Sequence, residues 1–185
     1  EDGIALVDGL EVGPDDAVVG ITASGSAAYV LAALRRAKER GSITIGVCTN
    51  AGSRLEGLCD VTIAPLVGPE VISGSTRMKS GTAQKMVLNM LTPCSMIKLG
   101  KVYGNLMVDL KASNKKLRDR ALRLIIHATG LTPEKAETFL EGAGGHVKLA
   151  ILMAKSGLDR EAAQDLLDRC EGRLAQAIET SQKEE

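Results

Sequence analysis

Two short, almost uninterrupted apolar runs constrain the fold of this chain more than any other feature. They are DAVVGITA at residues 16–23 and SITIGVCTN at residues 42–50, and both contain several β-branched side chains. Runs of this kind are typical of strands that are buried on both faces of a parallel sheet. Residues 27–41 between them have apolar positions at helical spacing and end at Gly41. The sequence therefore predicts a strand–helix–strand unit.

The same alternation continues downstream. We predict a short helix at residues 53–60 and a third strand at residues 61–65. A loop at residues 68–82, GPEVISGSTRMKSGT, then leads into an apolar helix over residues 81–104, with a kink at Pro93. Because this helix is apolar on more than one side, we expect it to be buried centrally or at a subunit interface. Alternating strands and helices predict an α/β fold with a parallel, doubly wound sheet flanked by helices.

The last third of the chain changes to short amphipathic segments with clear start and stop signals. Gly130 ends one segment, and Thr132 with Pro133 begins the next. We therefore predict a first domain over residues 1–129 and a small helical bundle with a polar tail over residues 130–185. The predicted helices of this part span residues 114–129, 132–142, 146–156 and 159–178.

Composition excludes several classes of partner. Lys plus Arg and Asp plus Glu are balanced at 23 each, and aromatic residues make up 2% of the 185 residues. Nucleic-acid binding is therefore not expected, since it needs a basic surface or a stacking platform. No uninterrupted apolar span reaches the roughly 20 residues that a membrane helix needs, so we expect no membrane partner.

The four cysteines are irregularly spaced and form no Cys-x-x-Cys pair. Thiols used in this way are typical of buried side chains in a reducing compartment, so we predict a cytoplasmic protein. Neither the cysteines nor the two histidines have metal-ligand spacing, and no Ser-His-Asp order is visible. We predict no metal site. The cysteines are Cys48, Cys59, Cys94 and Cys170.

The loop after the first strand is a candidate anion site. Ligands of parallel α/β sheets bind at the carboxyl ends of the strands, where loops enter helix N-termini. Here Thr22, Ser24 and Ser26 offer hydroxyls, and Gly25 allows close approach of the backbone. Free N–H groups of the following helix suit a phosphate monoester. The same serines could also act only as an ordinary helix cap.

The loop at residues 68–82 is the second candidate. The hydroxyls of Ser75, Thr76, Ser80 and Thr82 can cap the helix that follows or donate to anionic oxygens. Arg77 and Lys79 add positive charge beside that helix N-terminus. Glu70 is the single acid of the loop and is a candidate acceptor of sugar hydroxyls or a base. The residues alone do not name the ligand, and a plain surface loop remains the alternative.

Three stretches together resemble one known family. They are residues 16–25, DAVVGITASG, residues 68–91, GPEVISGSTRMKSGTAQKMVLNML, and residues 99–121, LGKVYGNLMVDLKASNKKLRDRA. This combination is similar to the bacterial N-acetylmuramic acid 6-phosphate etherases, which carry a sugar isomerase (SIS) fold. The resemblance implies that residues 1–129 are a partial SIS domain and that the chain is a carboxy-terminal portion lacking the first third of the family's length.

The resemblance also implies a reaction. Family members cleave the D-lactyl ether of N-acetylmuramic acid 6-phosphate by elimination and hydration, without a cofactor, as part of cell-wall amino-sugar recycling. The implied partners are a phosphorylated amino sugar and a second copy of the chain. A carbon–oxygen lyase activity is thus expected of the whole protein, whereas the 185-residue chain is expected to be inactive because half of the site would be missing.

Site residues follow from the resemblance and from the two loops. Glu1 is the position that matches one of the family's two glutamates, and Glu70 and Lys79 are candidates for sugar contacts or proton transfer. The expected substrate-binding residues are Thr22, Ser24, Gly25, Ser26, Ser75 and Thr76.

Two other functions stay open. The family commonly has Ser-Gly-Arg-Thr where this chain has SGSA at residues 24–27, which leaves room for a SIS module that binds a sugar phosphate and regulates a partner without turnover. An aldose–ketose isomerase acting on a hexose 6-phosphate would release no lactate.

Overall fold

A computed structural model describes residues 1–183 of the chain. The chain forms two compact units, Glu1–Leu91 and Thr92–Glu185. The predicted domain boundary at residues 129 and 130 falls within the second unit, between two of its helices, and that division stays a prediction. The end of the predicted polar tail, residues 184–185, lies outside the described residues.

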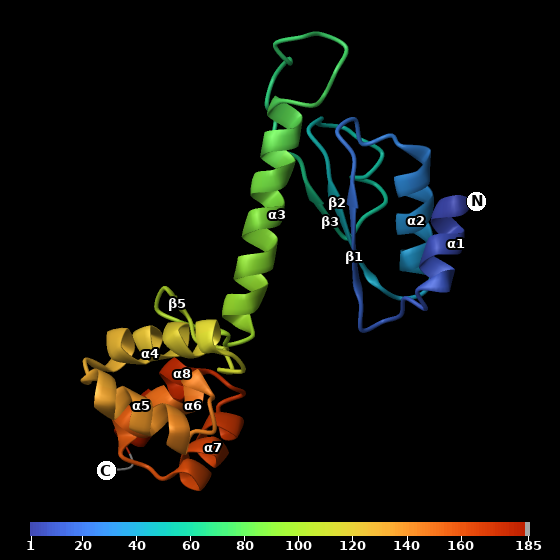
Figure 1. Ribbon diagram of the computed structural model, residues 1–185. Helices are drawn as coiled ribbons and strands as arrows, with labels where there is room; N and C mark the ends of the chain where they lie inside the picture. The colour runs from blue at the N-terminus through green and yellow to red at the C-terminus, as the bar shows by residue number, and fades with distance from the viewer. Residues whose placement is uncertain (184–185) are drawn as a thin grey trace. The chain divides into compact units, whose positions relative to one another are not determined.

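The first unit is built on a parallel sheet. Its strands are β1 (Ala17–Ile21), β2 (Ile43–Val47) and β3 (Val61–Ile63), in the order β1-β2-β3. Helix α2 (Ala28–Glu39) connects β1 to β2 and lies beside the sheet (Figure 1). The predicted α/β class and the parallel sheet flanked by helices are confirmed.

One face of this sheet is closely covered. Gly20 of β1 and Gly46 of β2 are neighbours in register. A Cβ atom on Gly20 would lie 2.4 Å from Cδ1 of Leu34, and one on Gly46 would lie 3.0 Å from Cβ of Leu55. Both leucines are fully buried. The two glycines therefore let α2 and the segment that carries Leu55 pack directly on the backbone of the sheet.

The opposite face is only partly covered. Val19 and Ile21 of β1 are 37% and 36% exposed, and Ile43 of β2 is 55% exposed, whereas Val47 is fully buried. The prediction that both faces are buried therefore holds at the end of β2 but is wrong for β1. The reason is that α2 and the turns that follow β2 pack on the same face of the sheet.

An additional helix precedes the sheet. Helix α1 (Asp2–Gly9) packs against α2, and both helices lie on one side of the sheet (Figure 1). Gly3 approaches the backbone carbonyl of Tyr29 so closely that a Cβ atom there would lie 2.4 Å from it. At the other end of α1, Asp8 accepts a hydrogen bond of 2.8 Å from Nε of Arg36. The sequence patterns did not predict α1, since its packing depends on these tertiary contacts.

The predicted helix at residues 53–60 is a series of turns instead. The amides of Leu58 and Cys59 both donate to the carbonyl of Leu55, at 3.0 and 2.9 Å. The amide of Asp60 then donates to the carbonyl of Thr44 at 3.1 Å, so the backbone leaves the turn and starts to pair with β2 instead of continuing a helix. The segment nevertheless places Leu55 in the core.

Helix α3 (Lys79–Lys98) follows the second candidate loop and includes Pro93. It ends earlier than predicted, because Gly100 has a φ of 68° and terminates the helix. Strands β4 (Val102–Tyr103) and β5 (Leu106–Met107) then form a small antiparallel hairpin.

Exposure of α3 differs from the sequence expectation. Only Ser80 and Val87 of this helix are buried, and Met86 and Met90 are 58% and 55% exposed. Central burial is therefore wrong for the part of the chain that the structure describes. The alternative expectation, burial at a subunit interface, stays a prediction.

Apart from the hairpin of β4 and β5, the second unit is helical, and the predicted helical character of the C-terminal part of the chain is confirmed. Side chains of Asn114, Thr132 and Asp159 cap the amino ends of three of its helices. The last predicted helix is split in two, because Glu171 and Gly172 adopt φ values of 53° and 72° that interrupt it. A single core includes the buried residues Ile125, Leu140, Ile151, Leu152, Leu166 and Leu174. The helices are α4 (Lys115–Thr129), α5 (Pro133–Gly142), α6 (Val147–Ser156), α7 (Arg160–Arg169) and α8 (Leu174–Ser181).

Candidate functional site

The loop after β1 folds back on itself through its hydroxyls. Oγ of Ser24 and Oγ of Ser26 lie 2.8 Å apart, and the amide of Ser26 donates to Oγ of Ser24 at 3.3 Å. Both serines are exposed. The backbone stays attached to the sheet, since the amide of Thr22 donates to the carbonyl of Val47 at 2.9 Å. This arrangement gathers two hydroxyls at the carboxyl edge of the sheet.

Gly25 is fixed at its position by two constraints. Its φ is 71°, which favours glycine. A Cβ atom added there would lie 2.3 Å from Cβ of Ser53, which no side chain tolerates. The loop therefore needs glycine at this position both for its backbone conformation and for close packing against the turn that follows β2.

The amino end of α2 adds backbone donors to this loop. Its N-cap residue is Ala27, which has no side chain able to cap the helix. The first N–H groups of a helix have no partners within the helix and carry partial positive charge. A loop with two hydroxyls at such a helix end is suited to an anion.

The loop before α3 is closed by one carboxylate. Glu70 accepts hydrogen bonds from the amides of Lys79 at 2.9 Å and of Ser80 at 3.1 Å. These bonds, with that from Lys79 first, hold the pKa of the Glu70 carboxyl below its usual value. Glu70 thus caps α3 from ten residues upstream, and its negative charge already occupies that helix N-terminus.

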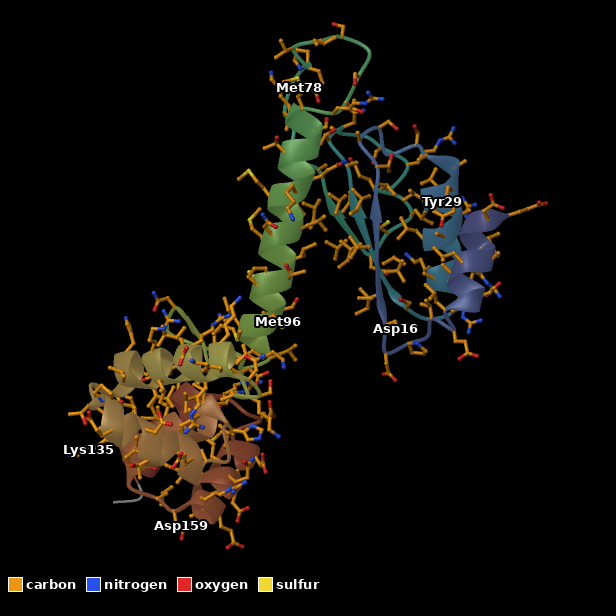
Figure 2. All side chains as sticks on the ribbon, viewed as in Figure 1. Asp16, Tyr29, Met78, Met96, Lys135 and Asp159 are labelled. Atoms are coloured by element: carbon orange, nitrogen blue, oxygen red, sulfur yellow. The ribbon has the colours of Figure 1, made fainter. Side chains whose placement is uncertain are left out.

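Arg77 and Lys79, the two cations of this loop, do not line the cavity between the two candidate loops. Nζ of Lys79 donates to the carbonyl of Pro69 at 2.9 Å, and this hydrogen bond connects the two ends of the loop. Arg77 is exposed, and neither residue lines the cavity. Figure 2 shows the neighbouring Met78 where the loop enters α3, and Asp16 at the other end of the first unit.

A cavity of about 450 Å³ lies between the two loops at this edge of the sheet. It brings together four of the predicted site residues, Ser24, Glu70, Ser75 and Thr76. The predicted residues Thr22, Gly25, Ser26 and Lys79 are not among its lining residues. The lining residues are Ser24, Thr49, Asn50, Val67, Gly68, Pro69, Glu70, Ser73, Gly74, Ser75, Thr76 and Ser80.

Two buried hydroxyls of this cavity contact each other, of which that of Ser80 was predicted as a helix cap or anion donor and that of Thr49 was not. Thr49 and Ser80 are 8% and 3% exposed, and their oxygens lie 2.9 Å apart. Oγ1 of Thr49 also donates to the carbonyl of Ala23 at 3.1 Å. The polar pair Thr49 and Asn50 at the end of an otherwise apolar strand was the available signal, but a partner 31 residues downstream is not visible in the sequence.

Glu1, predicted as a catalytic residue, lies outside the cavity lining. It is exposed and precedes the first turn of α1 as the N-cap residue. Because Gly3 packs on the backbone of Tyr29, the start of α1 lies at the same end of α2 as the loop of Ser24 and Ser26. Figure 2 shows Tyr29 at this position.

Larger depressions exist elsewhere, but they are less suited to a ligand. One of about 590 Å³ in the second unit is lined only by residues of α7, which are Ala162, Asp165, Asp168 and Arg169. One helix face offers no converging groups from separate elements, in contrast to the cavity at the sheet edge.

The structure describes residues 1–183. Within that range, no group of three or more His, Cys, Asp or Glu side chains is placed to hold a metal ion. Within the same range, no helix has the length and hydropathy to cross a bilayer.

A known domain family matches the first unit. Residues 1–92 match the family model of the SIS domain. The parallel sheet and the loops at its carboxyl edge, together with this match, identify the first unit as a SIS domain.

Over about nine-tenths of its length the chain is similar to proteins named N-acetylmuramic acid 6-phosphate etherase, so the predicted resemblance is confirmed. It is 52% identical over 164 residues to the etherase of Rubrobacter xylanophilus, covering 89% of this chain and 54% of that protein. It is 55% identical over 163 residues to the etherase of Caldanaerobacter subterraneus, covering 88% of this chain and 53% of that protein. The etherase of Clostridioides difficile is 52% identical over 168 residues, which are 91% of this chain and 55% of that protein. The chain spans about half the length of the curated relatives it matches.

Proposed function

We propose that this chain forms part of an enzyme that cleaves the D-lactyl ether of N-acetylmuramic acid 6-phosphate, giving N-acetylglucosamine 6-phosphate and D-lactate. The observation that carries the proposal is the identity of 52% to 55% with three proteins named as etherases of this substrate, over about nine-tenths of the chain. Such an enzyme is a carbon–oxygen lyase of cell-wall amino-sugar recycling.

The phosphate is proposed to bind at the loop after β1. The hydroxyls of Ser24 and Ser26 and the first N–H groups of α2 can donate to phosphate oxygens once the contact between the two serines opens. The amino end of α3 is a weaker candidate, because the carboxylate of Glu70 already caps it. Thr22 and Gly25 support the loop that carries the donors.

The amino sugar is proposed to lie against the opposite wall. Glu70 keeps lone pairs on both carboxylate oxygens and can accept hydrogen bonds from sugar hydroxyls. Ser75 and Thr76, which also line the cavity, provide hydroxyls that donate or accept. This orientation places the phosphate and the carboxylate of Glu70 on different walls, which limits the repulsion between them.

The proposed chemistry is a sequence of proton transfers around a carbonyl. The ring opens to an aldehyde, a base removes the proton on the adjacent carbon, lactate leaves from the next carbon, and water adds to the unsaturated aldehyde. Each positioned acid or base contributes about 10²–10⁴-fold, and donors to the enolate oxygen add to this. No step changes an oxidation state that would need a redox cofactor.

Glu1 is proposed as one proton-transfer carboxylate, on the resemblance alone. Lys79 is the other candidate for proton handling, although its ammonium group is engaged by the carbonyl of Pro69. The lowered pKa of Glu70 makes its carboxylate a weak base, so its contact with α3 favours sugar binding over proton abstraction.

The test is release of D-lactate from N-acetylmuramic acid 6-phosphate by the full-length protein that contains this chain. We expect lactate and N-acetylglucosamine 6-phosphate in equal amounts, and a Glu1→Gln variant with activity reduced at least about a hundredfold. Absence of lactate would contradict the proposal. The 185-residue chain by itself is proposed to bind the sugar phosphate without turnover, and measurable lactate release from it would overturn that statement.

A regulatory sugar-phosphate module is the second candidate. It is favoured by one feature of the sequence, the SGSA stretch at residues 24–27, in which Ala27 offers no hydroxyl or charge. Such a module would be stabilised by N-acetylglucosamine 6-phosphate in thermal denaturation, while the full-length protein would release no lactate.

We further propose that the protein is a cytoplasmic homodimer. Exposed apolar side chains on α3, among them Met86 and Met90, support an interface, and four free cysteines suit a reducing compartment. Light scattering of the full-length protein at several concentrations would measure the oligomeric state, and a monomer throughout would contradict the proposed dimer.

A further inference from the structure

We propose that Thr49 and Ser80 act as a positioning pair that fixes the two walls of the cavity relative to each other. The inference rests on the proposed sugar-phosphate site and concerns two side-chain hydroxyls that were not assigned to ligand binding in that site. The pair connects the end of β2 to the first turn of α3 through a hydrogen bond of 2.9 Å between buried hydroxyls.

The direction of these hydrogen bonds follows from the number of protons. A hydroxyl has one proton to donate, and that of Thr49 is used on the carbonyl of Ala23 at 3.1 Å. Ser80 is therefore the donor in its contact with Thr49. The result is a continuous chain from Ser80 through Thr49 to Ala23, the residue that directly precedes Ser24.

Backbone hydrogen bonds hold both ends of this series of hydrogen bonds in place. The amide of Thr49 donates to the same carbonyl of Ala23 at 3.0 Å, which extends the pairing of β1 and β2 into the loop. At the other end, the amide of Ser80 donates to Glu70 at 3.1 Å. A shift of either wall must therefore break a buried hydrogen bond or leave a buried hydroxyl without a partner, and both are costly.

The pair also sets the polarity of the cavity. Because Ser80 donates to Thr49, it presents only lone pairs to a ligand. Together with the carboxylate of Glu70, it makes the α3 side of the cavity rich in acceptors. We infer that this side selects hydroxyl or amide donors of the sugar, whereas the phosphate is directed to the loop of Ser24.

The chain offers closely matched control positions. Ser42 and Thr44 are a serine and a threonine of the same sheet region with 3% and 0% exposure. Both are hydrogen-bonded, Ser42 to the carbonyl of Asp16 and Thr44 to Asp60. They lie at the amino end of β2, away from the cavity, so their variants remove a buried hydroxyl without touching either wall.

The experiment compares Ser80→Ala and Thr49→Val with the controls Ser42→Ala and Thr44→Val in the 185-residue chain. Hydrogen exchange is measured in two segments, residues 22–26 and residues 68–80, without ligand. We expect each variant of the pair to speed exchange in both segments by about tenfold, and the controls to leave both unchanged. Faster exchange only in the segment that carries or adjoins the substitution would overturn the inference.

Binding of N-acetylglucosamine 6-phosphate, measured by calorimetry, provides the second readout. We expect about fivefold to tenfold weaker binding for Ser80→Ala and Thr49→Val, recovery in Thr49→Ser, and no change in the controls. Weaker binding without faster hydrogen exchange in both segments would show that the two hydroxyls contact the ligand directly. That result would contradict the positioning role. If the unaltered chain does not bind this ligand, the proposal that it binds the sugar phosphate without turnover fails, while the exchange data still decide whether the pair couples the two loops.

Discussion

The carboxylate of Glu70 lies 2.9 Å from the backbone nitrogen of Lys79 and accepts its hydrogen bond. This contact closes the loop before α3 and occupies the helix N-terminus with a negative charge. One consequence is that the more exposed donors at the start of α2 are the better place for a phosphate. Another is that Glu70 has a structural role whether or not it contacts a sugar.

Replacing Glu70 by alanine removes the cap of α3. We expect Glu70→Ala to lower the melting temperature by about 2–4 °C, since caps of this type stabilise helices and domains of this size respond by a few degrees. Glu70→Gln keeps one acceptor oxygen and should lose about half as much. Circular dichroism during heating measures both variants, and equal melting temperatures for all three proteins would contradict the capping role.

The contacts of Asp60 make the stability of the folded state depend on pH. It accepts hydrogen bonds from Oγ1 and the amide of Thr44 at 2.7 and 2.8 Å and pairs with Lys38 at 3.0 Å. The side-chain hydrogen bond from Thr44, followed by the others, holds the pKa of Asp60 well below its usual value. A carboxyl whose pKa is lower in the folded state than in the unfolded state, where it is about 3.9, stabilises the fold above that value and less as pH falls.

We therefore expect Asp60→Asn to be less stable than the unaltered chain above about pH 5 and the difference to shrink towards about pH 2. Urea unfolding at a series of pH values measures this difference. Asp15→Asn, a change at an exposed residue, serves as the control. A constant difference between the Asp60 variant and the unaltered chain across the whole range would mean that the carboxylate charge contributes nothing.

Gly25 and Gly52 form a matched pair for testing the loop after β1. Both have positive φ, 71° and 65°, but a Cβ atom would meet Ser53 at 2.3 Å from Gly25 and nothing within 4 Å from Gly52. We expect Gly52→Ala to cost about 1–2 kcal/mol for the left-handed backbone and Gly25→Ala to cost about 1–3 kcal/mol more for the overlap. Chemical denaturation compares the two, and equal losses would contradict the close packing.

Much of the first unit is predictable from the sequence, because its strands are local patterns. The runs at residues 16–23 and 42–50 contain β1 and β2, and the helical spacing between them marks α2. Helix α1 was not predictable in this way. Its position depends on Gly3 meeting the backbone of α2 and on Asp8 meeting Arg36, which are contacts between distant parts of the chain.

The candidate site is also predictable only where it depends on local sequence patterns. Ser24, Ser75 and Thr76 are recognisable from glycine- and hydroxyl-rich loops, and the structure brings them to one cavity. The role of Glu70 as a cap and the buried contact between Thr49 and Ser80 depend on segments that are separated along the chain. The ammonium group of Lys79, a candidate for sugar contacts or proton transfer, donates to the carbonyl of Pro69, a contact that the sequence did not indicate.

Calorimetric titration of the chain with N-acetylglucosamine 6-phosphate and with N-acetylglucosamine tests the proposed site most directly. We predict that the phosphorylated sugar binds at least about tenfold more tightly than the neutral one. Ser24→Ala should lose about tenfold in affinity for the phosphate ester, and Ser113→Ala, at an exposed serine of the second unit, should lose none. Equal affinities for the two sugars, no binding of either, or an unchanged Ser24→Ala variant would contradict a sugar-phosphate site between these two loops.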